Sequence, residues 1–189
     1  LGLGSGDVTP LELVNAYATI AAGGQFAEPV FINKIVAPDN SIVFQHKNER
    51  KQAIASSVAY QVTSLMRSVV EEGTARRVKS LGHPVAGKTG TTNEAESTWF
   101  TGYNDQIVTS VWVGFDQPKS LGDREFGSSI ALPIWLNYKK QIIDEIPMSS
   151  VLPPEGLSIV KIDRDSGKLA NELTNEPMFE YFLEESIPN

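Results

Sequence analysis

Three apolar, β-branched stretches follow one another at residues 84–91, 98–103 and 107–115, and they constrain the fold more than any other feature of the chain. The links between them are too short to hold a crossover helix, so we predict that the three strands form an antiparallel meander. Residues 107–115 (IVTSVWVGF) carry no charge. A strand without charges is typical of a position buried on both faces, so we expect this one at the centre of its sheet.

Three amphipathic segments predict helices beside these strands. The first begins with a capping box between Thr9 and Glu12 and ends at the glycine pair 23–24. The second begins at the serine pair 56–57, and the third spans residues 129–146. Helices beside an antiparallel sheet predict an α+β fold. The apolar positions that define the helical faces are Leu13, Tyr17, Ile20 and Ala21 in the first helix, Val58, Val62, Leu65, Met66 and Val69 in the second, and Ile134, Trp135, Tyr138 and Ile142 in the third.

A hairpin is predicted between the first two helices. Residues 29–36 and 42–45 have the pattern of strands, and Pro-Asp-Asn-Ser at residues 38–41 is a turn sequence. The charged stretch at residues 45–52 is expected to be a solvated loop.

The composition of the sequence changes after residue 146. Prolines punctuate a linker, residues 157–162 and 168–169 can pair across a turn, and residues 171–189 contain five glutamates and neither Lys nor Arg. Such a composition predicts an acidic, loosely held tail. We therefore predict a partial domain at residues 1–146 and an extension at residues 147–189.

The composition excludes several classes of function. The 189 residues include no cysteine and only two histidines, His46 and His83, so thiolate chemistry, disulfides and a His-based metal site are excluded, and we expect neither metal nor cofactor. Any nucleophile would need a lysine or a carboxylate as its base. A net charge of −7 argues against nucleic acid as a partner. No apolar run approaches the roughly 20 residues that span a bilayer. The chain begins at Leu1 without a methionine, so we expect it to be a fragment.

The string GHPVAGKTGTT at residues 82–92 fits two motifs that need different folds. From Gly82 to Thr89 it matches the phosphate-binding loop, which needs a buried strand before it and a helix after it. Here the preceding residues 76–80 are basic, a proline lies inside the string, and Gly90 and its neighbours open a helix poorly. The surroundings therefore argue against a phosphate loop. A plain surface strand with a lysine is a further interpretation of the string.

The second motif is the Lys-Thr-Gly triad of serine acyl-transfer enzymes, at Lys88, Thr89 and Gly90. On a strand, Lys88 and Gly90 share one face while Thr89 and Thr91 share the other. Gly90 has no Cβ, so a peptide can approach closely and add as an extra strand. Lys88 can hold a charge and pass a proton, and the two threonine hydroxyls can bind a terminal carboxylate. A backbone N–H near Thr91 can donate to an oxyanion.

Several segments together resemble one family. They are LGLGSGDVTPLELVNAYATIAAGG, SVAYQVTSLMRSVVEEGTA, GHPVAGKTGTTNEAESTWFTGY, VWVGFD and IALPIW, in the family's order across residues 1–140. The chain resembles the C-terminal half of the transpeptidase domain of bifunctional (class A) penicillin-binding proteins. The resemblance implies an antiparallel β-sheet flanked by helices, as in penicillin-binding transpeptidases and serine β-lactamases, present here as a partial domain.

The reaction implied by this resemblance is serine acylation. A Ser-x-x-Lys serine attacks the penultimate D-alanine carbonyl of a peptidoglycan stem peptide, the last D-alanine leaves, and an amine of a second stem resolves the acyl-enzyme. β-Lactam antibiotics mimic the donor. The resemblance implies that Lys88 and Thr91 are catalytic, with the Thr91 N–H as an oxyanion donor. It also implies that the substrate-binding residues are Thr89, Gly90, Thr91 and Thr92. It also implies the extracytoplasmic face of the bacterial envelope, a membrane anchor absent from this chain, and a glycan-polymerising domain in the parent protein.

The chain departs from the family pattern in its serine motifs. Ser-x-Asn is absent, and Ser-x-x-Lys occurs only at Ser158 and Lys161, downstream of the triad and in a strand-like stretch. Positions i and i+3 point oppositely on a strand, so this pair is not the catalytic one. Ser5 precedes a helix and is not a motif serine either. We expect the nucleophile in a missing N-terminal part of the same domain, which is then a partner of this chain, and we expect the fragment alone to be inactive. The alternative is a non-catalytic sensor or scaffold of the same fold.

Three smaller features have plainer explanations. Trp99 and Tyr103 flank the cleft strand, and we expect them to pack in the core. Glu94 and Glu96 are expected in a solvated loop, and the basic residues at 76–79 are expected in a surface loop.

Overall fold

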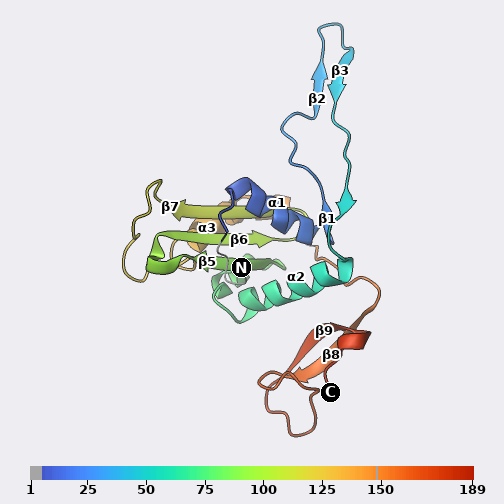
Figure 1. The fold of residues 1–189 in the computed structure, drawn as a ribbon, viewed down its shortest axis with the longest axis vertical. Helices are drawn as coiled ribbons and strands as arrows, with labels where there is room; N and C mark the ends of the chain where they lie inside the picture. Colours follow the sequence, from blue (N-terminus) through green and yellow to red (C-terminus); the bar gives the residue numbers. More distant parts are fainter. Residues whose placement is uncertain (1–5, 148) are drawn as a thin grey trace.

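The computed structural model describes residues 6–147 and 149–189 (Figure 1). Its centre is an antiparallel sheet of β5 (Ala86–Thr91), β6 (Ser97–Tyr103) and β7 (Val108–Gly114), in the order β5-β6-β7. The predicted meander is therefore confirmed. Among the described residues β7 pairs only with β6, so the expectation of a central place for this strand is wrong. Its lack of charge has another cause, because both α1 and α3 pack on it.

Helices flank this sheet, as an α+β fold requires. α1 (Pro10–Ala21) and α3 (Ala131–Ile142) pack on β6 and β7, and α2 (Ser56–Glu71) runs beside β5 (Figure 1). Alternate residues of β6 face the two layers: Tyr103 meets Tyr17 of α1, whereas Phe100 meets Trp135 of α3. Short 3₁₀ turns complete the element order, and these are η1 (Arg76–Leu81), η2 (Asn93–Ala95), η3 (Ile143–Glu145) and η4 (Glu184–Ser186).

The main core lies between α3 and the sheet. The Phe100 and Trp135 rings meet edge to face with their centroids 5.0 Å apart, and both side chains are fully buried. The indole N–H of Trp135 donates to the Thr109 carbonyl at 3.0 Å, so its polar atom is satisfied. A Cβ on Gly102 would stand only 2.7 Å from the Trp135 ring, so the ring occupies the space that a side chain would need.

The first helix begins and ends as its sequence predicts. The Thr9 side chain accepts from the Glu12 N–H, and the Glu12 carboxylate accepts from the Thr9 N–H, which completes the capping box. Gly23 and Gly24 follow the helix with φ of 66° and 87°, a backbone conformation that favours glycine.

The second helix differs from its predicted face. Its buried residues are Ala59, Tyr60, Thr63 and Val70, whereas Val58 and Leu65 of the predicted apolar stripe are exposed. The elements that contact α2 in this chain lie along the Ala59 side, and the described residues leave Val58 and Leu65 uncovered. The helix begins at Ser56, within the predicted serine pair, but neither serine caps it, because the N-cap is Ala55 and no side chain caps the helix.

The third helix is shorter than predicted, and its buried face is shifted. Trp135 is buried as expected, but Ile134 and Tyr138 are about half exposed. The helix instead buries Ala131, Leu132, Leu136 and Lys139. Lys139 is an amphipathic side chain whose ammonium lies 5.4 Å from the centroid of the Trp135 ring, which explains how a lysine is accommodated on this face.

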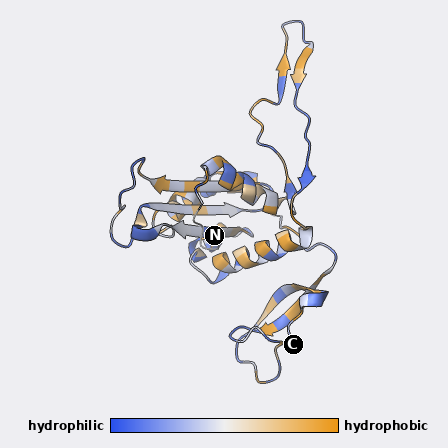
Figure 2. Cartoon of the chain, viewed as in Figure 1, coloured by the Kyte–Doolittle hydropathy of each residue, from blue (hydrophilic) through white to orange (hydrophobic). Residues whose placement is uncertain are grey.

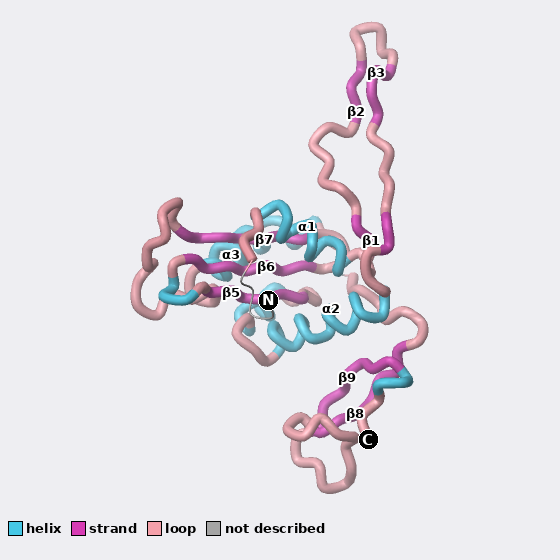
Figure 3. Tube along the Cα trace, viewed as in Figure 1, coloured by secondary structure: helices cyan, strands magenta, loops and turns pink. Residues whose placement is uncertain are grey.

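An extended arm projects from the end of α1, away from the sheet (Figures 1 and 3). Its base is the ladder of β1 (Gln25–Phe26) with β4 (Lys51–Gln52), and its outer part pairs β2 (Lys34–Val36) with β3 (Ile42–Gln45). The predicted hairpin is confirmed, although β2 is shorter than the predicted strand. β4 lies in a stretch that was expected to be loop. Apolar residues stand out along the arm, and Phe31 is 83% exposed (Figure 2).

The C-terminal segment is ordered against α2, so the prediction of a loosely held tail is wrong. β8 (Leu157–Asp163) pairs along its whole length with β9 (Pro177–Leu183), and the expected pairing near residue 169 is a single bridge. Glu180 is nearly buried and accepts a hydrogen bond from the Ser64 hydroxyl at 2.7 Å. The Tyr181 ring meets Tyr60 at 4.8 Å. Contacts with α2 therefore hold a strand that composition alone describes as a solvated tail.

Candidate active site

A groove of about 590 Å³ lies between the start of α1 and the strand β5. The five residues that the sequence singles out all line it, together with aromatic side chains from β6 and β7 and apolar residues from α1. Among the described strands β5 pairs only with β6, so its outer edge is an unpaired sheet edge. The lining residues include Lys88, Thr89, Gly90, Thr91, Thr92, Tyr17, Trp99 and Trp112.

The two faces of β5 carry different residues, as strand alternation predicts. Lys88 pairs with Thr101 and Gly90 pairs with Trp99, so these residues share the face toward α1. A Cβ on Gly90 would stand 3.2 Å from Trp99 Cβ, which is tight. The missing side chain at Gly90 thus lets Trp99 pack against the strand and leaves the groove open above it.

Lys88 is exposed, and its ammonium donates to the Thr89 carbonyl at 2.8 Å. The charge therefore lies against the motif strand itself. The described residues give Lys88 no carboxylate within salt-bridge distance, so its positive field is available to a ligand.

The two motif threonines are held from outside the motif. The Thr89 hydroxyl lies 2.9 Å from the Thr74 hydroxyl, and the Gly127 N–H donates to the Thr91 hydroxyl at 3.1 Å. Neither Thr74 nor Gly127 was expected from the sequence. They lie 15 and 36 residues from their partners in a sequence that shows no pattern linking them.

Thr92 plays a different part in the structure. It closes the turn between β5 and β6, where its hydroxyl accepts from the Ser97 N–H at 2.9 Å and its own N–H donates to the Ser97 carbonyl at 3.0 Å. Thr92 lines the groove, but these contacts commit its side chain to the turn.

Two tyrosines lie near this end of β6: Tyr17 lines the groove, and Tyr103 is buried in the core against the Tyr17 ring. Burial raises the pKa of Tyr17, and burial raises the pKa of Tyr103 to about 12. The Tyr103 hydroxyl also lies 2.9 Å from the Thr63 hydroxyl. Both tyrosines are therefore protonated at neutral pH, so neither acts as a base.

The sequence also drew attention to aromatic, acidic, basic and serine residues outside the motif. Tyr103 is in the core as expected, but Trp99 is only partly buried and lines the groove, with its ring 6.2 Å from that of Trp112. Glu94 is exposed as expected, although it lies in η2, and Glu96 is half-buried. Lys79 pairs with Glu71 at 3.0 Å on the surface, but the basic stretch forms η1 rather than the expected loop. Ser158 lies in β8, distant from the motif in the fold (Figure 1). Ser5 lies outside the described residues.

The structure also excludes the phosphate loop. The motif lysine lies in the middle of β5, and η1 rather than a buried strand precedes it. No helix begins at Lys88 and Thr89, so no helix N-terminus faces the position where phosphates would bind.

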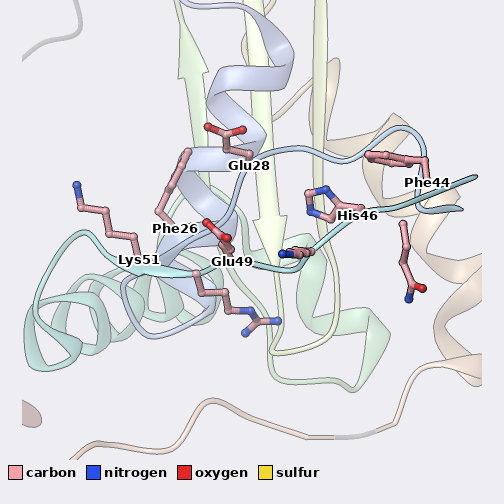
Figure 4. Close-up of a pocket in the computed structure, with 9 residues that line it drawn as sticks. Phe26, Glu28, Phe44, His46, Glu49 and Lys51 are labelled. Carbon is pink, nitrogen blue, oxygen red and sulfur yellow. The ribbon is translucent and has the colours of Figure 1, made fainter.

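A second hollow, of about 630 Å³, lies between the two legs of the arm. Figure 4 shows that Glu28, His46, Glu49 and Lys51 border it, so charges of both signs face one open space. Among the described residues no three His, Cys, Asp or Glu side chains are grouped to hold a metal ion. The groove at β5 is the candidate active site, because the residues of the Lys-Thr-Gly motif line it.

The described helices include none that is both long and apolar enough to cross a membrane.

An antiparallel sheet between helices, with Lys-Thr-Gly on its edge strand, defines a class of acyl-transfer folds. The chain matches the model of the penicillin binding protein transpeptidase domain over residues 1–138. It is 32% identical over 239 aligned residues to penicillin-binding protein 1A of Pseudomonas aeruginosa, covering 100% of this chain and 29% of the relative. It is 41% identical over 173 residues to penicillin-binding protein 1A of Aquifex aeolicus, covering 91% of this chain and 24% of the relative.

Solved structures agree with these relatives. The crystal structure of penicillin-binding protein 1A from Haemophilus influenzae superposes with a TM-score of 0.89 at 26% identity, covering 99% of this chain and 33% of that one. Penicillin-binding protein PonA1 from Mycobacterium tuberculosis gives a TM-score of 0.60 at 27% identity, covering 75% and 40%. The chain belongs to the penicillin-binding protein transpeptidase domain family. The expected fold and the resemblance to part of a class A transpeptidase domain are confirmed, and the chain spans less than a third of the two relatives' length.

Proposed function

We propose that the protein containing this chain is a peptidoglycan D,D-transpeptidase that forms a serine acyl-enzyme and is acylated by β-lactams. In this proposal the chain supplies the wall of the active site from Lys88 to Thr91, and another part of the domain supplies the nucleophilic serine. The observation that carries the proposal is the placement of these residues along the unpaired outer edge of β5, open to the groove. Relatives named penicillin-binding protein 1A support the same class of reaction.

The geometry suggests a role for each motif residue. A stem peptide adds along the outer edge of β5 as an extra strand, and Gly90 leaves room for its backbone. Lys88 supplies positive charge and moves a proton beside the serine. The hydroxyls of Thr89 and Thr91 bind the terminal carboxylate of the donor peptide. The Thr91 N–H donates to the oxyanion, and Thr92 borders the same cleft.

The proposed reaction conserves its atoms in two steps. The serine oxygen attacks the penultimate D-alanine carbonyl, the serine proton passes to the departing amine, and an ester and free D-alanine result. The amine of a second stem peptide then attacks the ester, an amide forms, and the serine regains its proton. A β-lactam follows the first step, but its opened ring stays attached.

The exposed face of α2 supports the need for a missing part of the domain. Val58 and Leu65 form an apolar face that the described residues leave uncovered. We infer that the N-terminal part of the same domain covers it and brings the serine to the groove. The proposed partial domain remains residues 1–146 with an extension from residue 147. The proposed location is the extracytoplasmic face of the bacterial envelope, with an anchor and a glycan-polymerising domain elsewhere in the protein.

Labelling of the full-length protein with fluorescent penicillin tests the proposal. The wild type should be labelled covalently, and Lys88→Ala should lose labelling without a change in melting temperature. Lys168→Ala is the matched control, because this exposed lysine lies in the C-terminal hairpin. Labelling that survives in Lys88→Ala would remove the role assigned to the lysine. A folded wild type that takes no label would favour a non-catalytic sensor or scaffold, and sequencing the codons before Leu1 shows whether Ser-x-x-Lys and Ser-x-Asn are present.

A further inference from the structure

Two segments outside the motif hold the hydroxyls of the motif strand. Thr74 follows α2, and its hydroxyl lies 2.9 Å from the Thr89 hydroxyl. Gly127 precedes α3, and its N–H donates to the Thr91 hydroxyl at 3.1 Å. The two threonines of β5 thus meet one hydrogen-bonding partner each, from two segments outside the motif.

Both partners lie in closely packed surroundings. A Cβ on Gly127 would stand 2.5 Å from the Trp99 carbonyl oxygen and 2.6 Å from the Gly90 carbonyl oxygen, so this backbone is pressed directly onto β5 and β6. Thr74 is followed by the fully buried Ala75, whose N–H donates to the Val69 carbonyl at 3.1 Å. These contacts fix the position from which each partner reaches its threonine.

The direction of each hydrogen bond decides where the hydroxyl protons point. An N–H can only donate, so the Thr91 oxygen accepts from Gly127 and its own O–H proton remains free for a ligand. Either hydroxyl of the Thr74 and Thr89 pair can be the donor. A carboxylate only accepts, so its arrival selects the arrangement in which Thr74 donates to Thr89 and Thr89 donates to the carboxylate.

We propose that Thr74 and the Gly127 N–H are positioning groups that turn the Thr89 and Thr91 hydroxyl protons toward one ligand carboxylate. The proposal rests on the proposed function, because it needs a carboxylate ligand at the outer edge of β5. Thr74 acts through Thr89 and Gly127 acts through Thr91, and neither takes part in the covalent step.

Acylation of the full-length protein by benzylpenicillin and by its methyl ester tests this inference. Thr74→Val keeps the shape of the side chain without a hydrogen bond, and Thr74→Ser keeps the hydroxyl. Thr74→Val loses the neutral hydrogen bond to Thr89, which should slow acylation by benzylpenicillin about two- to tenfold. Thr74→Ser should restore the rate. Acylation by the ester should change less in Thr74→Val than acylation by benzylpenicillin does, because an ester carbonyl is a neutral and weaker acceptor than a carboxylate. Intact-protein mass spectrometry follows each reaction.

The outcomes separate the inference from the function on which it rests. A Thr74→Val protein that reacts with benzylpenicillin like the wild type would overturn the inference. An equal loss of acylation rate with benzylpenicillin and with its methyl ester would overturn it too, because such a loss indicates a merely structural role. If Thr74→Val does not fold, as judged by thermal unfolding, Thr74→Ala removes the same hydroxyl with a smaller side chain. A folded wild type that reacts with neither penicillin would instead overturn the proposed function, and the inference with it.

Discussion

A single methyl group at Gly127 should separate the segment before α3 from the motif strand. The Cβ of Gly127→Ala would lie 2.5 Å from the Trp99 carbonyl oxygen, where contacts under 3.0 Å essentially never occur, so the backbone must move by at least the difference, 0.5 Å. The φ of Gly127 is not in the region that favours glycine, so the effect is steric. A shift of that size away from β5 would lengthen the 3.1 Å hydrogen bond from Gly127 to Thr91 beyond the usual range of about 3.2 Å.

The expected magnitude follows from these contacts. Overpacking of this kind costs about 1–3 kcal/mol of unfolding free energy. Loss of the hydrogen bond to Thr91 should slow acylation by benzylpenicillin about two- to tenfold. In the full-length protein we therefore expect a melting temperature lower by about 2 °C or more, together with slower labelling.

The matched control for this substitution is Ser128→Ala. It changes the adjacent residue, whose hydroxyl makes no hydrogen bond to the other described residues, and it should leave melting and labelling unchanged. A Gly127→Ala protein with wild-type melting and wild-type labelling would refute the reasoning, because the methyl group would then fit where the structure has no room for it.

Two further predictions concern α3 and the C-terminal hairpin. Burial lowers the pKa of Lys139 from 10.5 to about 8, so between these values the unfolded chain holds a proton that the folded chain has lost, and stability rises with pH through that window. At about 1.4 kcal/mol for each pKa unit this difference is worth about 3 kcal/mol, and water that reaches the ammonium reduces it. Lys139→Met should therefore raise the unfolding free energy by roughly 2 kcal/mol at pH 7 and by little at pH 10.5. Urea unfolding at the two pH values checks this, and an equal gain at both would contradict the assigned cause. For the hairpin, hydrogen exchange should show protected amides in β8 and β9, at residues 157–163 and 177–183. Tyr181→Ala removes the ring that meets Tyr60, so it should raise the exchange rate in the hairpin but not in β6. Fast exchange of these amides in the wild type would support a loosely held tail instead.

Local signals predicted the elements that surround the candidate site. The capping box at Thr9, the turn before β3 and the three strands of the meander depend on residues close in sequence, and all are confirmed. The alternation of Lys88 and Thr89 on β5 followed from strand geometry alone.

Features that depend on distant contacts were not predictable. Periodicity identifies apolar positions on α2 but not which of them this chain covers, so Leu65 was expected to be buried and is exposed. The acidic composition near Glu180 suggested a solvated tail, because nothing in the sequence shows that Ser64 satisfies that carboxylate. The contacts of Thr74 and Gly127 with the motif join segments far apart in the chain, and only the fold brings them together.

The most direct test of the central claim is a crystal structure of the full-length protein acylated by benzylpenicillin. If the outer edge of β5 is the wall of the acyl-transfer site, the penicillin carboxylate will lie about 3 Å or less from the hydroxyls of Thr89 and Thr91. The acyl group will then run along β5 past Gly90. A penicillin bound with its carboxylate turned away from β5, or attached at a serine remote from the groove, would contradict the account.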